Sequence, residues 1–145
     1  MGDFKNYNSS GGFDEYLYHQ VGDTITASNG LQGKVMNGNS DPKDEKFHEG
    51  LPMYSNTSEV YFKRNDQPPH EIEQARIYEG RRVSKDFDWG HAHGSHEKGV
   101  VHVQEWYYNS KGQWVRRKKE RGLNNAEIKR YGELIKLANP NAKLR

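Results

Sequence analysis

The stretch Asp86-Phe-Asp-Trp-Gly-His-Ala-His-Gly-Ser-His-Glu-Lys-Gly-Val-Val-His-Val-Gln-Glu-Trp106 contains two strand-like runs joined by a glycine-rich loop. Acidic and aromatic residues alternate from Asp86 to Trp89, which is the two-residue period of a strand with one buried face. We expect Phe87 and Trp89 to point into the core. Gly90 breaks the alternation, and an extended pattern resumes over residues 99–108. The stretch therefore predicts a β-sheet with a loop at one end.

The same stretch is rich in histidine. It holds four of the seven histidines of the chain, three in the loop and one in the second strand. Imidazole titrates near neutral pH, so it can transfer protons or bind a metal ion. The cluster is therefore the candidate active site, and its members are His91, His93, His96 and His102.

The predicted strand over residues 99–108 has no purely apolar face. Such a strand is either central with a polar site on one side, or bulged. One face carries Val100, His102, Gln104, Trp106 and Tyr108, and the other carries Val101, Val103, Glu105 and Tyr107.

Further strands are predicted on both sides of this stretch. Turn signals separate short β-rich runs, and the pair Asn29-Gly30 is typical of a hairpin. The predicted strands cover residues 23–27, 34–36, 60–62, 72–78, 83–89 and 113–119.

One helix is predicted at the end of the chain. Asn124 followed by Glu127 forms a capping-box pattern, and Pro140 ends the helix. An apolar face follows at helical spacing, formed by Ile128, Tyr131, Leu134, Ile135 and Ala138. We therefore expect an α+β fold, a twisted antiparallel sheet with a C-terminal helix, for which a barnase-like arrangement is one candidate.

Composition limits the architecture. A length of 145 residues suits one domain, with 32% hydrophobic residues and a mean hydropathy of −1.18. We interpret residues 1–20 as a linker or loosely docked arm and residues 21–145 as a single domain. The absence of cysteine excludes disulfides and thiolate zinc sites. No apolar run suits a membrane span or a signal peptide, so we expect a soluble domain.

Charge is unevenly distributed along the chain. Residues 1–110 carry 11 basic and 17 acidic side chains, whereas residues 111–145 carry 11 basic and 3 acidic ones. The two parts have net charges of −6 and +8, which sum to the +2 of the whole chain. A basic C-terminal part beside a histidine cluster favours a polyanionic partner.

Three segments resemble a known family. They are Gly50 to Asn56 with Val60 to Arg64, then Gln74 to Tyr78 with Phe87 to His93, and then Glu97 to Trp106; a closing helix over residues 127–141 follows. On these segments, residues 50–145 resemble the C-terminal toxin domains of bacterial polymorphic toxins, which are secreted in interbacterial competition.

The resemblance implies a nuclease, often a metal-independent ribonuclease, that is neutralised by a cognate immunity protein. We expect that partner to be acidic, because the C-terminal part of this chain is basic. The resemblance also implies secretion from the producing bacterium and action in the cytoplasm of the target cell. Residues 1–49 match no known segment and would join the domain to a delivery module.

Metal-independent RNA cleavage needs a base for the 2′-hydroxyl, an acid for the leaving 5′-oxygen and a cation near phosphorus. The candidate catalytic residues are His91, His93 and His102, with Glu105 as an alternative base or orienting group. The expected phosphate contacts are Arg116, Arg117, Lys118 and Lys119, and Tyr107, Tyr108 or Trp114 would stack a base.

Two alternatives stay open at this point. In one, His91 and His93 bind a divalent metal such as zinc, completed by His102 or Asp88, although the spacing matches no common zinc pattern. EDTA sensitivity would separate this metal-dependent nuclease or phosphoesterase from the metal-independent enzyme. In the other, the domain is a non-catalytic interaction module, and the histidines are surface residues or hydrogen-bonded strand residues.

Overall fold

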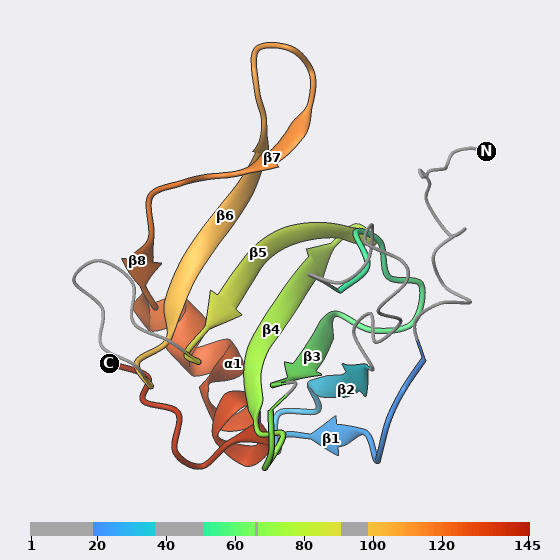
Figure 1. Cartoon of the computed structure of the whole chain (residues 1–145), viewed down its shortest axis with the longest axis vertical. Helices are drawn as coiled ribbons and strands as arrows, with labels where there is room; N and C mark the ends of the chain where they lie inside the picture. Colours follow the sequence, from blue (N-terminus) through green and yellow to red (C-terminus); the bar gives the residue numbers. More distant parts are fainter. Residues whose placement is uncertain (1–18, 37–50, 66, 91–98) are drawn as a thin grey trace.

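The computed structural model describes residues 19–36, 51–65, 67–90 and 99–145. In these ranges eight strands form one mixed sheet, and one C-terminal helix covers one of its faces (Figure 1). The α+β class predicted from the sequence is confirmed. The elements are β1 (Ile25–Thr26), β2 (Gln32–Met36), β3 (Val60–Arg64), β4 (Ile72–Glu79), β5 (Arg82–Asp88), β6 (His102–Tyr108), β7 (Trp114–Arg116), β8 (Arg121–Gly122) and α1 (Asn125–Ala138).

The strands follow the chain in order across the sheet, from β1 to β7, and β8 also pairs with β6. Six of the seven pairings are antiparallel, but β2 and β3 run parallel. The expectation of a wholly antiparallel sheet was therefore wrong. A parallel pair needs a crossover connection, and the long segment between Met36 and Val60 provides it.

The predicted hairpins are present. The β1–β2 turn contains Gly30 at φ 89°, and the β4–β5 turn places Gly80 and Arg81 at φ 57° and 70°. Two consecutive positive φ values give the type of turn that matches the twist of a hairpin. The β6–β7 hairpin extends beyond the rest of the sheet (Figure 1). Strand β6 is central, with β5 on one side and β7 and β8 on the other, as its mixed faces suggested.

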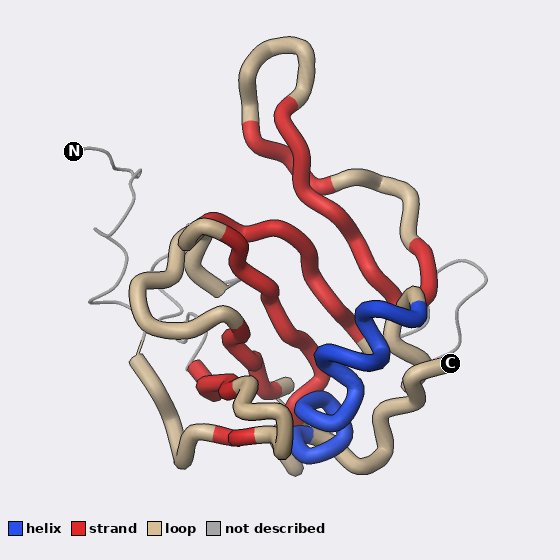
Figure 2. Tube along the Cα trace, turned by 180° about the vertical axis from the view of Figure 1, so that it is seen from behind, coloured by secondary structure: helices blue, strands red, loops and turns tan. Residues whose placement is uncertain are grey.

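The helix forms where its capping signal predicts it. The Asn124 side chain accepts a hydrogen bond from the backbone of Glu127, and the Glu127 carboxylate accepts one from the backbone of Asn124. Figure 2 shows α1 lying across the strands, where its buried residues complete the main core. No helix in the described ranges is both long enough and apolar enough to cross a membrane. The main core includes Phe62, Ile77, Phe87, Trp89, Val103, Tyr131, Leu134 and Ile135.

The sheet face opposite the helix has a different composition. A smaller apolar cluster covers part of it, formed by Met36, Leu51, Tyr61, Tyr78 and Val83. Beside this cluster lie the buried charged side chains of Arg76 and Asp86. We call this surface the open face, since α1 lies on the other side of the sheet. Polar and charged residues therefore occupy the middle of a sheet face, where they require partners.

Candidate active site

Two of the predicted catalytic residues, His91 and His93, lie outside the described residues, as does His96. The described chain on either side of them converges. The Gly99 amide donates a hydrogen bond of 2.9 Å to the carbonyl of Trp89. The two described residues that flank this region therefore meet at one place, the end of β5.

His102 is described and is buried, with 1% of its surface exposed. Its Nδ1 lies 3.3 Å from the Val100 carbonyl oxygen, and its Nε2 lies 3.3 Å from Glu120 Oε2. This position makes His102 part of the packing beneath the surface rather than a group that meets solvent. No local pattern predicts the pairing with Glu120, because it follows from the long-range contact of β8 with β6.

The sheet register brings Asp88 directly opposite His102, on β5 and β6. Gln74 and Lys63 continue the same cross-strand row on β4 and β3. Residues directly opposite each other on paired strands project from the same face of a sheet. The structure therefore places a lysine, an amide, a carboxylate and an imidazole side by side on the open face.

Glu105 is separated from this row. It lies three residues after His102 on β6, so it projects from the opposite, helix-covered face. Its side chain is 48% exposed, and its Oε2 lies 3.4 Å from Arg121 Nη2. Its cross-strand partner is Lys85. The structure does not bring Glu105 together with His102 or Asp88.

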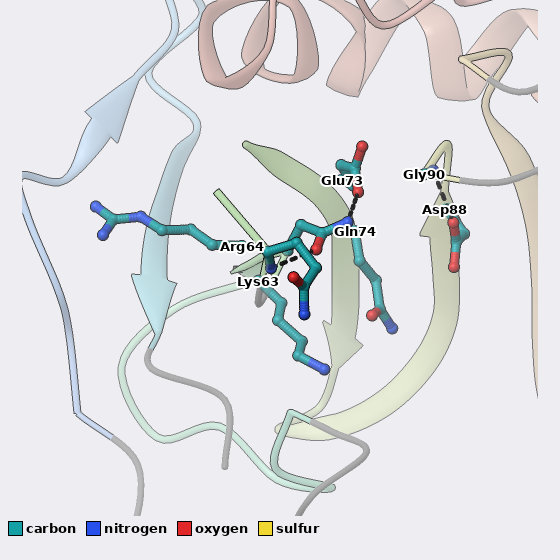
Figure 3. Close-up of a pocket in the computed structure, with 8 residues that line it drawn as sticks. Lys63, Arg64, Glu73, Gln74, Asp88 and Gly90 are labelled. Atoms are coloured by element: carbon teal, nitrogen blue, oxygen red, sulfur yellow. Dashed lines mark hydrogen bonds between the residues drawn. The ribbon is translucent and has the colours of Figure 1, made fainter. Parts of the chain in front are cut away.

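An open pocket of about 350 Å³ lies where β3 and β5 end and β4 begins (Figure 3). Lys63 and Asp88 supply a cation and a carboxylate to it, whereas the side chains of Arg64 and Glu73, which also line it, point away from these two (Figure 3). Figure 3 shows the side chains of Lys63, Gln74 and Asp88 pointing to the same side. Chemically, such a pocket can hold a phosphate on its cation and accept a proton on a carboxylate.

The wall of the pocket depends on Gly90. A Cβ atom at Gly90 would lie 2.9 Å from both Cβ and Oε1 of Glu73, closer than packed atoms approach. The adjacent Trp89 amide donates a hydrogen bond of 3.0 Å to the Glu73 carbonyl, and the Gly90 amide donates one of 3.0 Å to Asp88 Oδ1. Glycine therefore permits the close approach of β4 that fixes the end of β5 beside the pocket.

A buried charge network lies next along the open face. Arg76 donates to both carboxylate oxygens of Asp86, and its Nη1 donates a hydrogen bond of 2.7 Å to the Leu51 carbonyl. The Trp106 indole donates to Asp86 Oδ2 at 3.1 Å, and Arg116 Nη1 lies 3.5 Å from the same oxygen. Arg116 is thus the one predicted phosphate contact that the structure ties to this network.

The other predicted substrate contacts lie on the β6–β7 hairpin and in the residues that follow it. Arg117 stacks 4.4 Å from the ring centre of Tyr107, and Lys118 and Lys119 follow in an exposed segment. Tyr108 and Trp114 meet edge to face at 4.5 Å. The Arg82 guanidinium contacts both rings, a role for which Arg82 was not predicted.

The helix side of the sheet carries a separate ionic network. Glu127 accepts from Lys85 Nζ at 2.7 Å and from Arg121 Nη1 at 2.7 Å. Burial alone would raise the pKa of Glu127, but the hydrogen bonds from Arg121, Lys85 and Asn124 lower this pKa to about 2. This network ties α1 to β5 and β8, and it lies on the opposite side of the sheet from the pocket.

Within the described ranges no three His, Cys, Asp or Glu side chains are grouped so as to hold a metal ion. Of the four ligands in the metal alternative, His102 and Asp88 are adjacent across β5 and β6, whereas His91 and His93 lie outside the described residues.

Comparison of the chain with protein-family models, with curated proteins and with solved structures found no match.

Proposed function

We propose that this chain is a nuclease domain that cleaves RNA by metal-independent acid–base chemistry at the pocket formed by Lys63, Gln74, Asp88 and Gly90. The observation that carries the proposal is the position of the pocket. Its wall ends at Gly90, and the histidine-rich segment begins at the next residue, His91. The pocket proposed to bind phosphate thus ends at the residue that directly precedes the most histidine-rich part of the sequence.

In the proposed reaction, Lys63 neutralises the charge of the phosphodiester. A base takes the proton of the 2′-hydroxyl while the 2′-oxygen forms a bond to phosphorus. The bond from phosphorus to the 5′-oxygen then breaks, and an acid protonates that oxygen. The products are a 2′,3′-cyclic phosphate and a free 5′-hydroxyl.

His91 and His93 are the proposed base and acid, and Asp88 is the carboxylate that orients one of them or serves as the base. His102 is proposed as a positioning residue behind Asp88, since its ring is buried. Each general acid or base contributes about 10²- to 10⁴-fold to such a reaction. Glu105 has no part in this scheme, because it projects from the opposite face of the sheet.

The wider setting of the proposal follows from the toxin-domain resemblance. The chain would be secreted by a bacterium, act on RNA in the cytoplasm of a target cell and be inhibited by an acidic immunity protein. The barnase-like arrangement is part of the same proposal, since a helix on one face of the sheet leaves the other face for substrate. The exposed basic residues Arg116 to Lys119 support a polyanionic partner.

The test is to incubate the purified full chain with total RNA and with plasmid DNA, with and without EDTA. The same assay is applied to His91→Ala, His93→Ala and His102→Gln, with His19→Gln as a matched control on an exposed histidine. We expect RNA cleavage that EDTA does not affect and a loss of at least about 100-fold in the His91 and His93 variants.

Undiminished cleavage in all three histidine variants would overturn the proposed mechanism. Cleavage that stops with EDTA would support the metal-dependent alternative instead. A folded chain that cleaves neither RNA nor DNA would leave the interaction module as the better interpretation.

A further inference from the structure

We propose that the open face also carries a subsite that stacks an unpaired nucleobase, formed by Arg82, Tyr54, Tyr108 and Trp114. We call these four residues the arginine–aromatic cluster. The inference rests on the proposed function for its substrate, but it concerns a different place on the molecule. It assigns single-stranded RNA of several nucleotides as the preferred ligand.

The cluster is built around one guanidinium group. The Arg82 guanidinium carbon lies 5.2 Å from the ring centre of Tyr108, 5.3 Å from that of Trp114 and 6.0 Å from that of Tyr54. Arg82 also donates to the Tyr108 hydroxyl, and the Trp114 indole donates to the Val83 carbonyl at 3.2 Å. These contacts hold the rings in place before any ligand binds.

The rings are nevertheless accessible. Tyr108 is 54% exposed and Tyr54 is 37% exposed, so part of each ring is open to solvent. An open pocket of about 370 Å³ lies against the cluster, and Tyr54, Arg82, Trp106 and Trp114 line it. Preformed aromatic and guanidinium surfaces beside open space are what single-strand-binding proteins use to stack bases.

The charges favour a base over a phosphate inside this pocket. Glu79 also lines it, and a carboxylate repels phosphate but accepts hydrogen bonds from the N–H groups on base edges. Arg82 and Glu79 both line the pocket, so its formal charges cancel, and further positive charge lies outside it, where Arg116 is exposed on the same face. The cluster therefore fits a base, while the neighbouring cations fit the backbone.

The separation of the two sites sets the length of the ligand. Tyr108 lies six residues beyond His102 on β6, a distance of about 20 Å at the rise of an extended strand. His102 is directly opposite Asp88, which lines the proposed cleavage pocket. A dinucleotide at the pocket cannot reach the cluster, whereas a longer single strand can occupy both.

The test measures binding without cleavage. The full chain is titrated into a fluorescent, non-cleavable 2′-O-methyl RNA of eight unpaired nucleotides. The variants are Tyr108→Ala, Trp114→Ala and Arg82→Lys, with Tyr107→Ala as the matched control. Tyr107, which the sequence also suggested as a stacking residue, has the same side chain on the same strand but projects from the other face, against Arg117, so it lies outside the cluster. Thermal unfolding confirms that each variant is folded.

We expect the Kd of the single strand to rise roughly 5- to 100-fold in Tyr108→Ala and Trp114→Ala, the range for loss of one stacked base. Tyr107→Ala should stay within about twofold of the unmodified chain. If Trp114→Ala fails to fold, Tyr108→Ala alone decides the result, because its exposed ring is the less important for folding. Equal losses for Tyr107 and Tyr108, or no loss in either, would overturn the subsite.

A kinetic comparison separates this inference from the proposed function. Tyr108→Ala should raise KM for an eight-nucleotide substrate and leave dinucleotide cleavage unchanged. If Tyr108→Ala cleaves RNA but its KM for the eight-nucleotide substrate is unchanged, the subsite is overturned and the proposed nuclease activity still holds. Binding that depends on Tyr108 in a chain that cleaves no RNA would retain the subsite and overturn the nuclease.

Discussion

Arg76 and Asp86 form a two-point ion pair in the middle of the sheet. Arg76 Nε lies 2.7 Å from Asp86 Oδ1, and Arg76 Nη2 lies 3.1 Å from Asp86 Oδ2. Both residues are buried, with 6% and 2% of their surfaces exposed. Such a pair is tolerated only where further hydrogen bonds complete it, and here Leu51 and Trp106 provide them.

Asp86→Asn should therefore be strongly destabilising. The change leaves a buried guanidinium without its counter-charge, a loss of about 3–5 kcal/mol in the free energy of unfolding. Urea unfolding at neutral pH measures it. Asp88→Asn is the matched control, since Asp88 is on the same strand and face but only half-buried, and we expect it to cost about 1 kcal/mol or less. Equal effects of the two changes would contradict the structural role of the pair.

The ionic network of Glu127 makes stability depend on pH. The pKa of Glu127 is lowered from an ordinary value of 4.5 to about 2, so the folded state holds the carboxylate in its charged form. Its contribution is complete above pH 4.5 and is lost as the pH falls towards 2. Glu127→Gln should lower the free energy of unfolding by roughly 1.5–3 kcal/mol at pH 7, and this difference should shrink through that window.

Unfolding in urea at a series of pH values between 7 and 2 measures the difference. Glutamine also suits a capping box, so the variant removes the charge more than the cap. Glu105→Gln is the control, because it removes an exposed carboxylate from the same network and should change stability by less than about 1 kcal/mol. A difference for Glu127→Gln that stays constant down to pH 2 would contradict the lowered pKa.

Asp88 and Glu105 project from opposite faces of the sheet, so replacing them should affect RNA cleavage differently. Asp88 lines the pocket beside Lys63, whereas Glu105 projects from the other face. Asp88→Asn should reduce RNA cleavage by about 10²-fold or more if Asp88 orients or performs the proton transfer. Glu105→Gln should leave cleavage within about threefold of the unmodified chain. Initial rates on one RNA substrate test both, and loss of activity in Glu105→Gln alone would instead restore the role expected from sequence.

Local patterns predicted the elements well because they depend on neighbouring residues. The alternation from Asp86 to Trp89 predicted which side chains of β5 are buried, and Asn124 with Glu127 predicted the start of α1. The strands β4, β5 and β6 and the turn at Asn29-Gly30 followed from the same kind of signal.

Long-range pairing could not be predicted in the same way. Strand β8 consists of Arg121 and Gly122, which carry no hydrophobic pattern, and it forms because β6 offers a free edge beyond β7. The ion pair of Arg76 with Asp86 depends on the register of β4 against β5. The arginine–aromatic cluster likewise assembles residues that are far apart in sequence. Of the candidate site, His102 and Asp88 are brought together, whereas Glu105 is not.

His102 and Glu120 should be energetically coupled. Their side chains are mostly buried and lie 3.3 Å apart between Nε2 and Oε2. His102→Ala removes a buried ring and leaves the Glu120 carboxylate without the imidazole, whereas Glu120→Leu removes that charge. We expect the double variant to lose about 1–3 kcal/mol less free energy of unfolding than the two single variants lose together. A double-mutant cycle from urea unfolding measures the coupling, and strict additivity would show that the two residues act independently.

The stability of the fold should depend on glycine at position 33, where β2 passes beneath the helix. A Cβ atom there would lie 2.4 Å from Cε2 of Phe62 and 3.3 Å from Cδ2 of Leu134, both in the main core. Gly33→Ala should therefore cost about 1–3 kcal/mol, because the Phe62 ring and the Leu134 side chain must move. Gly122→Ala is the matched control on β8, where a Cβ atom would meet nothing within 4 Å, and it should stay within about 0.5 kcal/mol of the unmodified chain. Thermal or urea unfolding compares the two, and equal stability of the variants would mean that α1 does not press on β2 as closely as the structure indicates.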